Sequence, residues 1–224
     1  MEDLQNTINR VHNQYFVSSD LHGVLTKYTE RCEEYEKEFL SFGYTTPPEV
    51  ALKGMRLLKS NDADTKVLDF ACGTGLVAAA MVKQGFKGKI YGVDGSEGML
   101  RVARSKDIYL NLTEKIVLPE TKLNYEDCSF DGVLNCGGFA DDQLDPGVIP
   151  ELLRVTKRNG VIVMTARYND PPMEYQKKFD FQVRKLEDRG LWRKASLEKA
   201  HYFNCDFYNN NQPLIATIYC YLKN

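Results

Sequence analysis

The sequence predicts an α/β fold: a seven-stranded, mostly parallel sheet with helices on both faces and an antiparallel hairpin at its C-terminal end. Apolar runs typical of buried strands alternate with segments of helical periodicity through most of the chain. Strands that alternate with helices pair in parallel through right-handed crossovers. Two strand-like runs separated by a turn-rich segment close the chain, which is typical of a hairpin.

The length and composition fit a globular protein of this class. The chain has 224 residues, of which 43% are hydrophobic and 27% charged, enough for a sizeable core. The net charge of −2 gives no broad field that would attract nucleic acid or an anionic membrane. No apolar run approaches the roughly 20 residues that cross a bilayer, and the polar, acidic start is unlike a secretory signal. We expect a cytoplasmic protein, a monomer or homodimer, that binds neither nucleic acid nor membrane.

The cysteines predict no metal site. The chain has six cysteines and three histidines, with no C-x-x-C pair and no cluster of histidines with cysteines. Structural zinc sites need such clusters. Reduced thiols in a reducing compartment are therefore expected.

Residues 1–45 are expected to form a helical N-terminal lid. Tyr28, Cys32, Tyr35 and Phe39 recur at the spacing that places side chains on one helix face. This face either packs on the core or covers a site, and the pattern alone leaves both interpretations open.

Residues 46–224 are expected to form the main domain. It opens with a helix over residues 46–58, because Pro47 and Pro48 suit a first helical turn. Later helices are expected from Leu76, from Ser96 as N-cap, and over residues 149–155, the last ended by Asn159-Gly160. The first five strands are expected at residues 66–69, 89–94, 108–112, 130–135 and 161–166.

The terminal hairpin is expected to use two strand-like runs. They span residues 201–207 and 213–222, and the asparagine-rich segment 208–212 lies between them. Such turn-rich segments join antiparallel strands. These two runs complete the count of seven strands.

The loop after the first strand is the most informative functional feature. Gly73-Thr74-Gly75-Leu76-Val77-Ala78 satisfies the dinucleotide pattern G-x-G-x-x-A. However, the strand ends in Asp69, four residues before Gly73, whereas a pyrophosphate-binding loop follows its strand almost directly. No dehydrogenase site is evident either. An NAD(P) site is therefore the weaker of two cofactor hypotheses.

S-adenosylmethionine suits this loop better, because it carries no phosphate. Asp69 would orient its amino-acid end, and the backbone from Ala71 to Gly75 would pass along the methionine part. Asp94 ends the next strand, 19 residues after Gly75. Its carboxylate oxygens suit the two ribose hydroxyls. Both acidic residues are expected at neighbouring strand ends, where open α/β sheets bind ligands.

Three motifs then carry a resemblance to a known family. They are Val67-Leu68-Asp69-x-Ala71-Cys72-Gly73-Thr74-Gly75, Tyr91-Gly92-Val93-Asp94-Gly95-Ser96-x-x-Met99-Leu100-x-x-Ala103 and Ser129-Phe130-Asp131-Gly132-Val133. This set resembles the Rossmann-like, class I S-adenosylmethionine-dependent methyltransferases. Gly43-Tyr44-x-x-Pro47 and the segment 149–160 further resemble the methyltransferase-like proteins named after the Williams-Beuren syndrome region. The resemblance covers about residues 40–167, and Ala71 stands where the family pattern has its first glycine.

The loop and the resemblance together imply a set of cofactor-binding residues. Asn111 and Leu112 align with the pair that meets the adenine, and Tyr28 and Tyr35 resemble the tyrosines that close over the methionine end. The expected set is Asp69, Ala71, Gly73, Thr74, Gly75, Asp94, Gly95, Met99, Asn111, Leu112, Asn135, Cys136, Tyr28 and Tyr35.

The methyl acceptor is expected beyond the fourth strand. Asn135-Cys136-Gly137-Gly138 differs from the Asn/Asp-Pro-Pro-Tyr/Phe motif of base-methylating members, which argues against an adenine substrate. Gly137, Phe139 and Tyr168 are the expected substrate-binding residues. The N-terminal segment and a second insertion over residues 167–192 are expected to shape the acceptor pocket above the strand ends.

Few side chains near this position suggest chemistry of their own. Asp141, Asp142 and Asp145 either hold a cationic acceptor or a metal, or form a solvated turn, which is the favoured interpretation. Cys136 has no basic neighbour that would lower its pKa. His22 and His201 qualify as bases by type only, so no catalytic residue is assigned.

The leading hypothesis is a methyltransferase that moves a methyl group from S-adenosylmethionine directly, in line, to an oxygen or nitrogen of a small molecule. The alternatives are an NAD(P)-dependent oxidoreductase and a non-catalytic protein that binds S-adenosylmethionine and acts as a partner.

Overall fold

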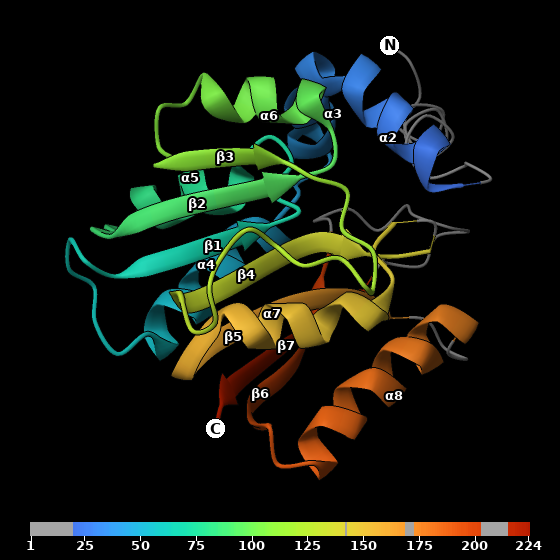
Figure 1. The fold of residues 1–224 in the computed structure, drawn as a ribbon. Helices are drawn as coiled ribbons and strands as arrows, with labels where there is room; N and C mark the ends of the chain where they lie inside the picture. The colour runs from blue at the N-terminus through green and yellow to red at the C-terminus, as the bar shows by residue number, and fades with distance from the viewer. Residues whose placement is uncertain (1–19, 142, 169–172, 203–214) are drawn as a thin grey trace.

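A seven-stranded sheet forms the centre of the molecule (Figure 1). In the computed structural model, the described residues are 20–141, 143–168, 173–202 and 215–224. The strand order is β3-β2-β1-β4-β5-β7-β6. The strands are β1 (Lys66–Phe70), β2 (Lys89–Asp94), β3 (Asn111–Glu114), β4 (Phe130–Phe139), β5 (Thr156–Tyr168), β6 (Trp192–His201) and β7 (Ile215–Lys223).

The pairing confirms the predicted sheet. From β3 to β5 each strand is parallel to its neighbours, and β7 is antiparallel to both β5 and β6. The strand order reverses direction between β1 and β4. Open α/β sheets bind ligands at such a switch point, outside the carboxyl ends of the strands.

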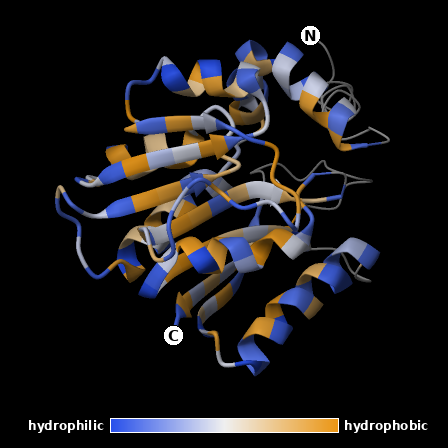
Figure 2. Ribbon diagram, in the orientation of Figure 1, coloured by the Kyte–Doolittle hydropathy of each residue, from blue (hydrophilic) through white to orange (hydrophobic). Residues whose placement is uncertain are grey.

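Helices cover both faces of the sheet, as predicted. On one face, apolar side chains of α4 and α5 pack against β1, β2 and β5; on the other, those of α7 and α8 pack against β4 and β5. Figure 2 shows apolar and polar residues alternating along α7 and α8, as expected of helices with one buried side. The helices are α2 (Leu21–Glu30), α3 (Cys32–Ser41), α4 (Thr46–Leu57), α5 (Leu76–Lys83), α6 (Glu97–Arg104), α7 (Ile149–Val155) and α8 (Glu174–Asp188), with a 3₁₀ turn at Pro146–Val148.

Among the first five strands, β3, β4 and β5 differ most from the predicted bounds. β3 begins three residues later than expected, and β4 continues to Phe139 through a shift in pairing after Asn135. Asn159-Gly160 does not end α7, which stops at Val155, but forms an irregularity inside β5, where Asn159 has φ 58°. Asn159 and Gly160 are residues typical of a turn, so the sequence predicted a helix end at this point. In the structure, β5 pairs with β4 before them at Thr156 and again directly after them at Val161.

The terminal hairpin is present, but its first strand comes earlier than predicted. β6 ends at His201, where the expected run begins, and His201 pairs with Ile215 at the start of β7. β6 lies at the edge of the sheet, paired with β7, and most of its residues are exposed and many are charged. It therefore lacks the hydrophobic pattern by which a strand is predicted. The predicted turn at 208–212 lies outside the described residues, as do residues 1–19 of the predicted lid.

Candidate cofactor and acceptor site

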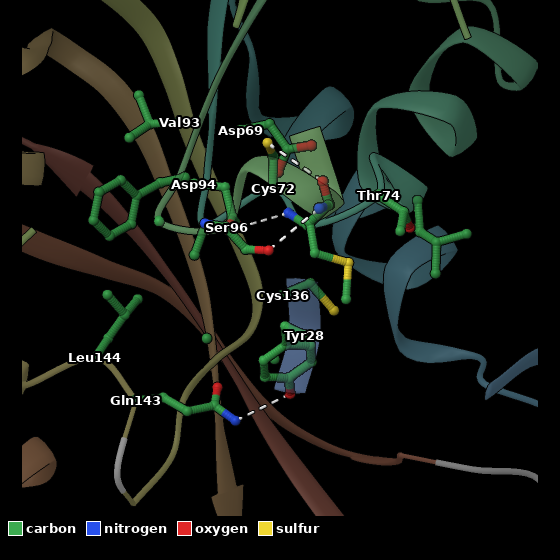
Figure 3. A pocket seen from close by; sticks show the side chains of 18 of the residues that line it. Tyr28, Asp69, Cys72, Thr74, Val93, Asp94, Ser96, Cys136, Gln143 and Leu144 are labelled. Atoms are coloured by element: carbon green, nitrogen blue, oxygen red, sulfur yellow. Dashed lines mark hydrogen bonds between the residues drawn. The ribbon is translucent and has the colours of Figure 1, made fainter. Parts of the chain in front are cut away.

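One cavity lies at the carboxyl ends of β1, β2 and β4, beneath α2 (Figure 3). Its empty volume is about 1070 Å³, part of it open to solvent. Around it the structure brings together eleven of the residues expected to bind cofactor or acceptor: Tyr28, Tyr35, Asp69, Ala71, Gly73, Thr74, Asp94, Gly95, Met99, Cys136 and Gly137.

The loop between β1 and α5 has left-handed backbone at three positions. Gly73 has φ 54° and Gly75, the N-cap of α5, has φ 91°. A side chain at Gly75 would meet Tyr109, 3.0 Å away, so only glycine fits there. Ala71 has φ 52°, a conformation that costs an alanine about 1–3 kcal/mol. The residue that departs from the family pattern is therefore held in the backbone conformation of the glycine it replaces.

Asp94 connects the loops after β1 and β2. One carboxylate oxygen accepts the Gly73 N–H at 2.8 Å, and the other accepts the Ser96 N–H at 2.9 Å. Burial raises the pKa of Asp94, and these backbone bonds oppose that rise. A carboxylate has about four acceptor sites, so Asp94, which lines the cavity, keeps acceptor capacity beyond these backbone bonds.

Asp69 lies under the glycine loop and is 1% exposed. Tyr109 donates its hydroxyl to one carboxylate oxygen at 2.7 Å. The other oxygen has no hydrogen-bond partner among the described residues. Burial raises the pKa of Asp69 to about 7, although the Tyr109 bond lowers it. The sequence did not indicate a role for Tyr109. It falls in residues 108–112, which were predicted as the third strand, but β3 begins only at Asn111.

Three further buried oxygens lack a hydrogen-bond partner in the described part of the chain: Thr74 Oγ1, Asn135 Oδ1 and the Tyr125 hydroxyl. Of these three residues, Thr74 lines the cavity. Buried polar atoms are nearly always paired in native proteins, so the Thr74 hydroxyl and the second Asp69 oxygen fit a polar ligand. The carboxylates of Asp69 and Asp94 and the hydroxyl of Thr74 match an ammonium and ribose hydroxyls better than they match a phosphate, which the two carboxylates would repel.

The residues predicted to meet the adenine are corrected by the true position of β3. Asn111 and Leu112 lie within that strand and border a separate hollow with Tyr109. Since the strand ends at Glu114, the residues that reach the main cavity are the next three in the chain: Lys115, Ile116 and Val117.

Three more predicted residues do not line the cavity. Asn135 is fully buried and donates its side-chain N–H to the Phe70 carbonyl at 2.8 Å, which joins β4 to β1. Phe139 lies in the core, edge-to-face with Phe179 at 5.0 Å. Gly75 is the N-cap of α5 and does not line the cavity. Tyr168 ends β5 opposite Ile215, and the prediction for its side chain lies outside the described residues.

Five aromatic side chains line one side of the cavity in a continuous series; we call them the ring wall. They are Tyr28, Tyr35, Phe39, Tyr44 and Tyr202. Successive ring centroids lie 6.0, 4.2, 5.6 and 5.0 Å apart in that order. The helical spacing predicted a shared face for Tyr28, Tyr35 and Phe39, but Tyr202 arrives from the end of β6, which no local pattern indicates.

Polar contacts fix both ends of the ring wall. At one end Gln143 donates to the Tyr28 hydroxyl at 3.2 Å (Figure 3). At the other, Tyr44 donates to the Tyr202 hydroxyl at 3.2 Å, and the Cys136 sulfur lies 3.4 Å from the Tyr44 oxygen. Burial raises the pKa of Cys136 to about 12 and that of Tyr44 above its ordinary value. These groups therefore stay protonated at neutral pH.

Most of the second predicted insertion, residues 167–192, is helix α8, which packs on one face of the sheet. Phe179, Val183 and Leu186 of α8 are buried in the core, so they do not shape the acceptor side. At its N-terminal end, Tyr175 donates to the Leu144 carbonyl beside the cavity. Residues 169–172 of this insertion lie outside the described part.

The acidic turn after β4 has structural partners. Asp145 caps the 3₁₀ turn through the Gly147 N–H and pairs with Lys178. Asp141 is exposed, and Asp142 lies outside the described residues. Within the described ranges, no group of three or more His, Cys, Asp or Glu side chains forms a metal-binding cluster. His22 and His201 are exposed and do not line the cavity.

Comparison with known proteins agrees with this geometry. Residues 68–164 match the family described as a methyltransferase domain. Human methyltransferase-like protein 27 is 33% identical over 173 residues, which cover 77% of this chain and 69% of that protein. The demethylmenaquinone methyltransferase of Clavibacter sepedonicus is 34% identical over 111 residues, 50% of this chain and 44% of that protein.

A solved structure shares the fold. The TehB-like S-adenosylmethionine-dependent methyltransferase from Corynebacterium glutamicum aligns with a TM-score of 0.60 and 15% identity, over 89% of this chain and 100% of that one. Among the described residues, no helix is long and apolar enough to cross a membrane. The glycine loop, the two strand-end carboxylates and the sequence relatives set the NAD(P) hypothesis aside. The chain belongs to the class I S-adenosylmethionine-dependent methyltransferases, enzymes that use this cofactor as methyl donor.

Proposed function

We propose that this enzyme methylates an oxygen or nitrogen of a small molecule by direct in-line transfer. The observation that carries the proposal is that one cavity is bordered both by the glycine loop with Asp94 and by the ring wall. A cofactor held on the first side and an acceptor held on the second would meet within the same enclosed space. The demethylmenaquinone methyltransferases among the relatives support a small acceptor by analogy.

In the proposed arrangement, Asp94 binds the ribose hydroxyls with its remaining acceptor sites. The adenine lies between Met99 and the segment from Lys115 to Val117. Thr74 and the unpaired oxygen of Asp69 face the amino-acid end, directly or through water. We further propose that α2 and α3 act as the lid, with Tyr28 and Tyr35 near the sulfonium, where aromatic rings attract a cation by about 0.5–2 kcal/mol.

The bound cofactor supplies an electrophilic methyl group on a sulfonium. The chain's own residues then need to orient the acceptor and exclude water. No histidine lines the cavity among the described residues, and Cys136 is a neutral thiol, so nucleophilic catalysis by the protein is not part of the proposal. Positioning within the cavity, rather than a strong general base, would supply most of the rate enhancement.

We also propose that the protein is cytoplasmic. Cys32, Cys72, Cys128, Cys136 and Cys220 are free thiols in the structure, in keeping with the cytoplasm.

Two measurements test the function. Calorimetry with S-adenosylhomocysteine should detect micromolar binding, and incubation with methyl-labelled cofactor and a cell extract should place label in the small-molecule fraction. Label in protein only would contradict the small-molecule acceptor. Binding without any labelled product would instead favour the non-catalytic partner hypothesis.

A further inference from the structure

The composition of the acceptor side defines a class of acceptor. We propose that the ring wall takes an uncharged, aromatic molecule carrying a hydroxyl, and that the hydroxyl bonds to the Tyr44–Tyr202 pair. This inference rests on the proposed function and narrows its substrate class. Tyr202 would then be a specificity-determining residue for the acceptor.

The ring wall has no ionised group of its own. Tyr28 and Tyr35 are half-buried and present the more accessible ring surface, whereas Phe39, Tyr44 and Tyr202 are buried. Tyr35 and Phe39 are stacked at 4.2 Å and 29°, and Tyr44 and Tyr202 at 5.0 Å and 26°. Aromatic pairs prefer such offset or edge contacts and gain about 0.5–1.5 kcal/mol beyond their buried area. A planar guest would continue this series of rings, whereas a saturated one of the same size would gain only its burial.

The charged residues on the cavity surface are engaged elsewhere. Among the described lining residues the carboxylates are Asp69, bonded to Tyr109, and Asp94, bonded to Gly73 and Ser96. The Lys115 ammonium donates to the Lys122 carbonyl at 2.8 Å. These bonds are to neutral groups and leave the three charges in place, but none of the three residues belongs to the ring wall. A charged acceptor on the ring wall would therefore exchange its hydration for apolar ring surface, which is costly.

The Tyr44–Tyr202 end of the ring wall is held by close contacts with α4 and β4. Thr46 donates to the Tyr202 carbonyl at 3.2 Å, which fastens the end of β6 to the start of α4. The two tyrosine hydroxyls meet over Gly137, which has φ 80° and donates its N–H to Thr165 at 2.8 Å. A Cβ at Gly137 would lie 2.6 Å from the Tyr202 oxygen and 3.0 Å from the Tyr44 oxygen.

Gly137 is therefore required for both hydroxyls to reach the cavity surface at the end of β4. A phenolic hydroxyl can donate one bond and accept two. Because burial keeps both phenols protonated, the pair can bond to a guest hydroxyl in addition to each other. This places a defined polar contact at one end of an otherwise apolar surface.

Four probes of similar size test the class on protein saturated with S-adenosylhomocysteine: 2-naphthol, its saturated analogue decahydro-2-naphthol, 2-naphthoate and the 2-naphthylmethylammonium ion. Calorimetry should show 2-naphthol binding at least about tenfold more tightly than the other three, since the saturated probe loses ring stacking and the ions lose hydration. Equal binding of a charged or saturated probe, or no binding of 2-naphthol, would overturn the proposal.

The Tyr202→Phe variant tests the polar contact. It should weaken 2-naphthol binding about three- to tenfold, the value of one hydrogen bond, leave naphthalene binding unchanged and leave cofactor-product binding within twofold. Tyr221→Phe is the matched control, because Tyr221 is equally buried but bonds to Glu187 away from the cavity. An equal loss for naphthalene and 2-naphthol would show that Tyr202 only supports packing.

The two proposals fail in different ways. If S-adenosylhomocysteine does not bind, the proposed function fails, and the same probes on the free enzyme still report the preference of the ring wall. If it binds and the probes show no preference for 2-naphthol, only the acceptor class is wrong.

Discussion

At the scale of single residues, the loop after β1 shows how a departure from a family pattern is accommodated. Ala71 keeps the left-handed backbone that a glycine would adopt freely. The conformation persists because Cys72 donates its N–H to the Val93 carbonyl at 3.1 Å and Gly73 donates to Asp94. Hydrogen bonds on both following residues thus hold the strained position.

We predict that Ala71→Gly stabilises the fold by about 0.5–1 kcal/mol, because relief of the left-handed strain exceeds the added entropy of the unfolded chain. Guanidinium unfolding measures this change. The control is Ala79→Gly in α5, where ordinary helical backbone should make glycine destabilising by about 1 kcal/mol. A loss of stability at both positions would refute the strain at Ala71.

Asp69 predicts a pH dependence of stability. Its pKa in the folded protein is about 7, raised from 3.8 by burial. Between these values the folded protein retains a proton that the unfolded chain has released, so stability falls as the pH rises through this window. Unfolding at about pH 5 and pH 7.5 should show a larger loss in the wild type than in Asp69→Asn. An identical pH dependence in the two proteins would mean that Asp69 ionises normally.

Asp94 has a different task from Asp69. Asp94→Ala should weaken S-adenosylhomocysteine binding by about 1–3 kcal/mol, from lost charge-assisted bonds to the ribose. Asp64→Ala serves as the control, since the Asp64 carboxylate is exposed and pairs only with Lys89. Unchanged affinity of the Asp94 variant in calorimetry would place the ribose elsewhere.

At the scale of elements, the contact between α2 and α6 positions the lid over the cavity. The Thr29 and Ser96 hydroxyls lie 2.8 Å apart, and Ser96 also caps α6 through the Met99 N–H. Leu21, Val24, Leu25 and Tyr28 of α2 line the cavity. The packing is close because α6 presents a glycine: a Cβ at Gly98 would lie 2.5 Å from the Thr29 carbonyl oxygen.

We therefore predict that Gly98→Ala displaces α2 and weakens S-adenosylhomocysteine binding about tenfold, since such overpacking costs about 1–3 kcal/mol. Limited proteolysis should cut α2 faster in this variant, while the sheet keeps its circular dichroism signal. Glu97→Ala, at an exposed neighbouring position, is the control. Wild-type affinity in Gly98→Ala would mean that α2 does not take part in binding.

Elements differ in how well the sequence predicts them. The buried strands β1 and β2 and the starts of helices α4 and α6 carry strong local signals and were predicted near their true positions. Of β5, the apolar part at residues 161–166 was predicted, but not its first five residues. β3 is short and has no buried residue, and β6 is a charged edge strand, so their hydrophobic pattern is weak. Because β3 lies further along the chain than predicted, Asn111 and Leu112 fall within the strand, whereas Lys115, Ile116 and Val117 follow it and line the cavity.

At the scale of the whole molecule, the site is assembled from segments far apart in the chain. The glycine loop and Asp94 follow from strand order and were predictable, because parallel strands end at the same edge of a sheet. Gln143 and Tyr202 were not, because each reaches the cavity through tertiary packing that no local periodicity reports. Tyr109 was not predicted either; it bonds to Asp69 without lining the cavity. The donor side of the enzyme is thus encoded locally, and the acceptor side is encoded by the fold.

The central claim is that this one cavity holds the methyl donor, with its ribose at Asp94 and its sulfur toward Cys136 and Gly137. A crystal structure of the S-adenosylhomocysteine complex measures this directly. We expect both ribose hydroxyls within hydrogen-bond distance of the Asp94 carboxylate, the adenine beside Ile116, and the sulfur facing the ring wall. A ligand seated in the hollow beside Asn111, or a ribose without contact to Asp94, would contradict the account.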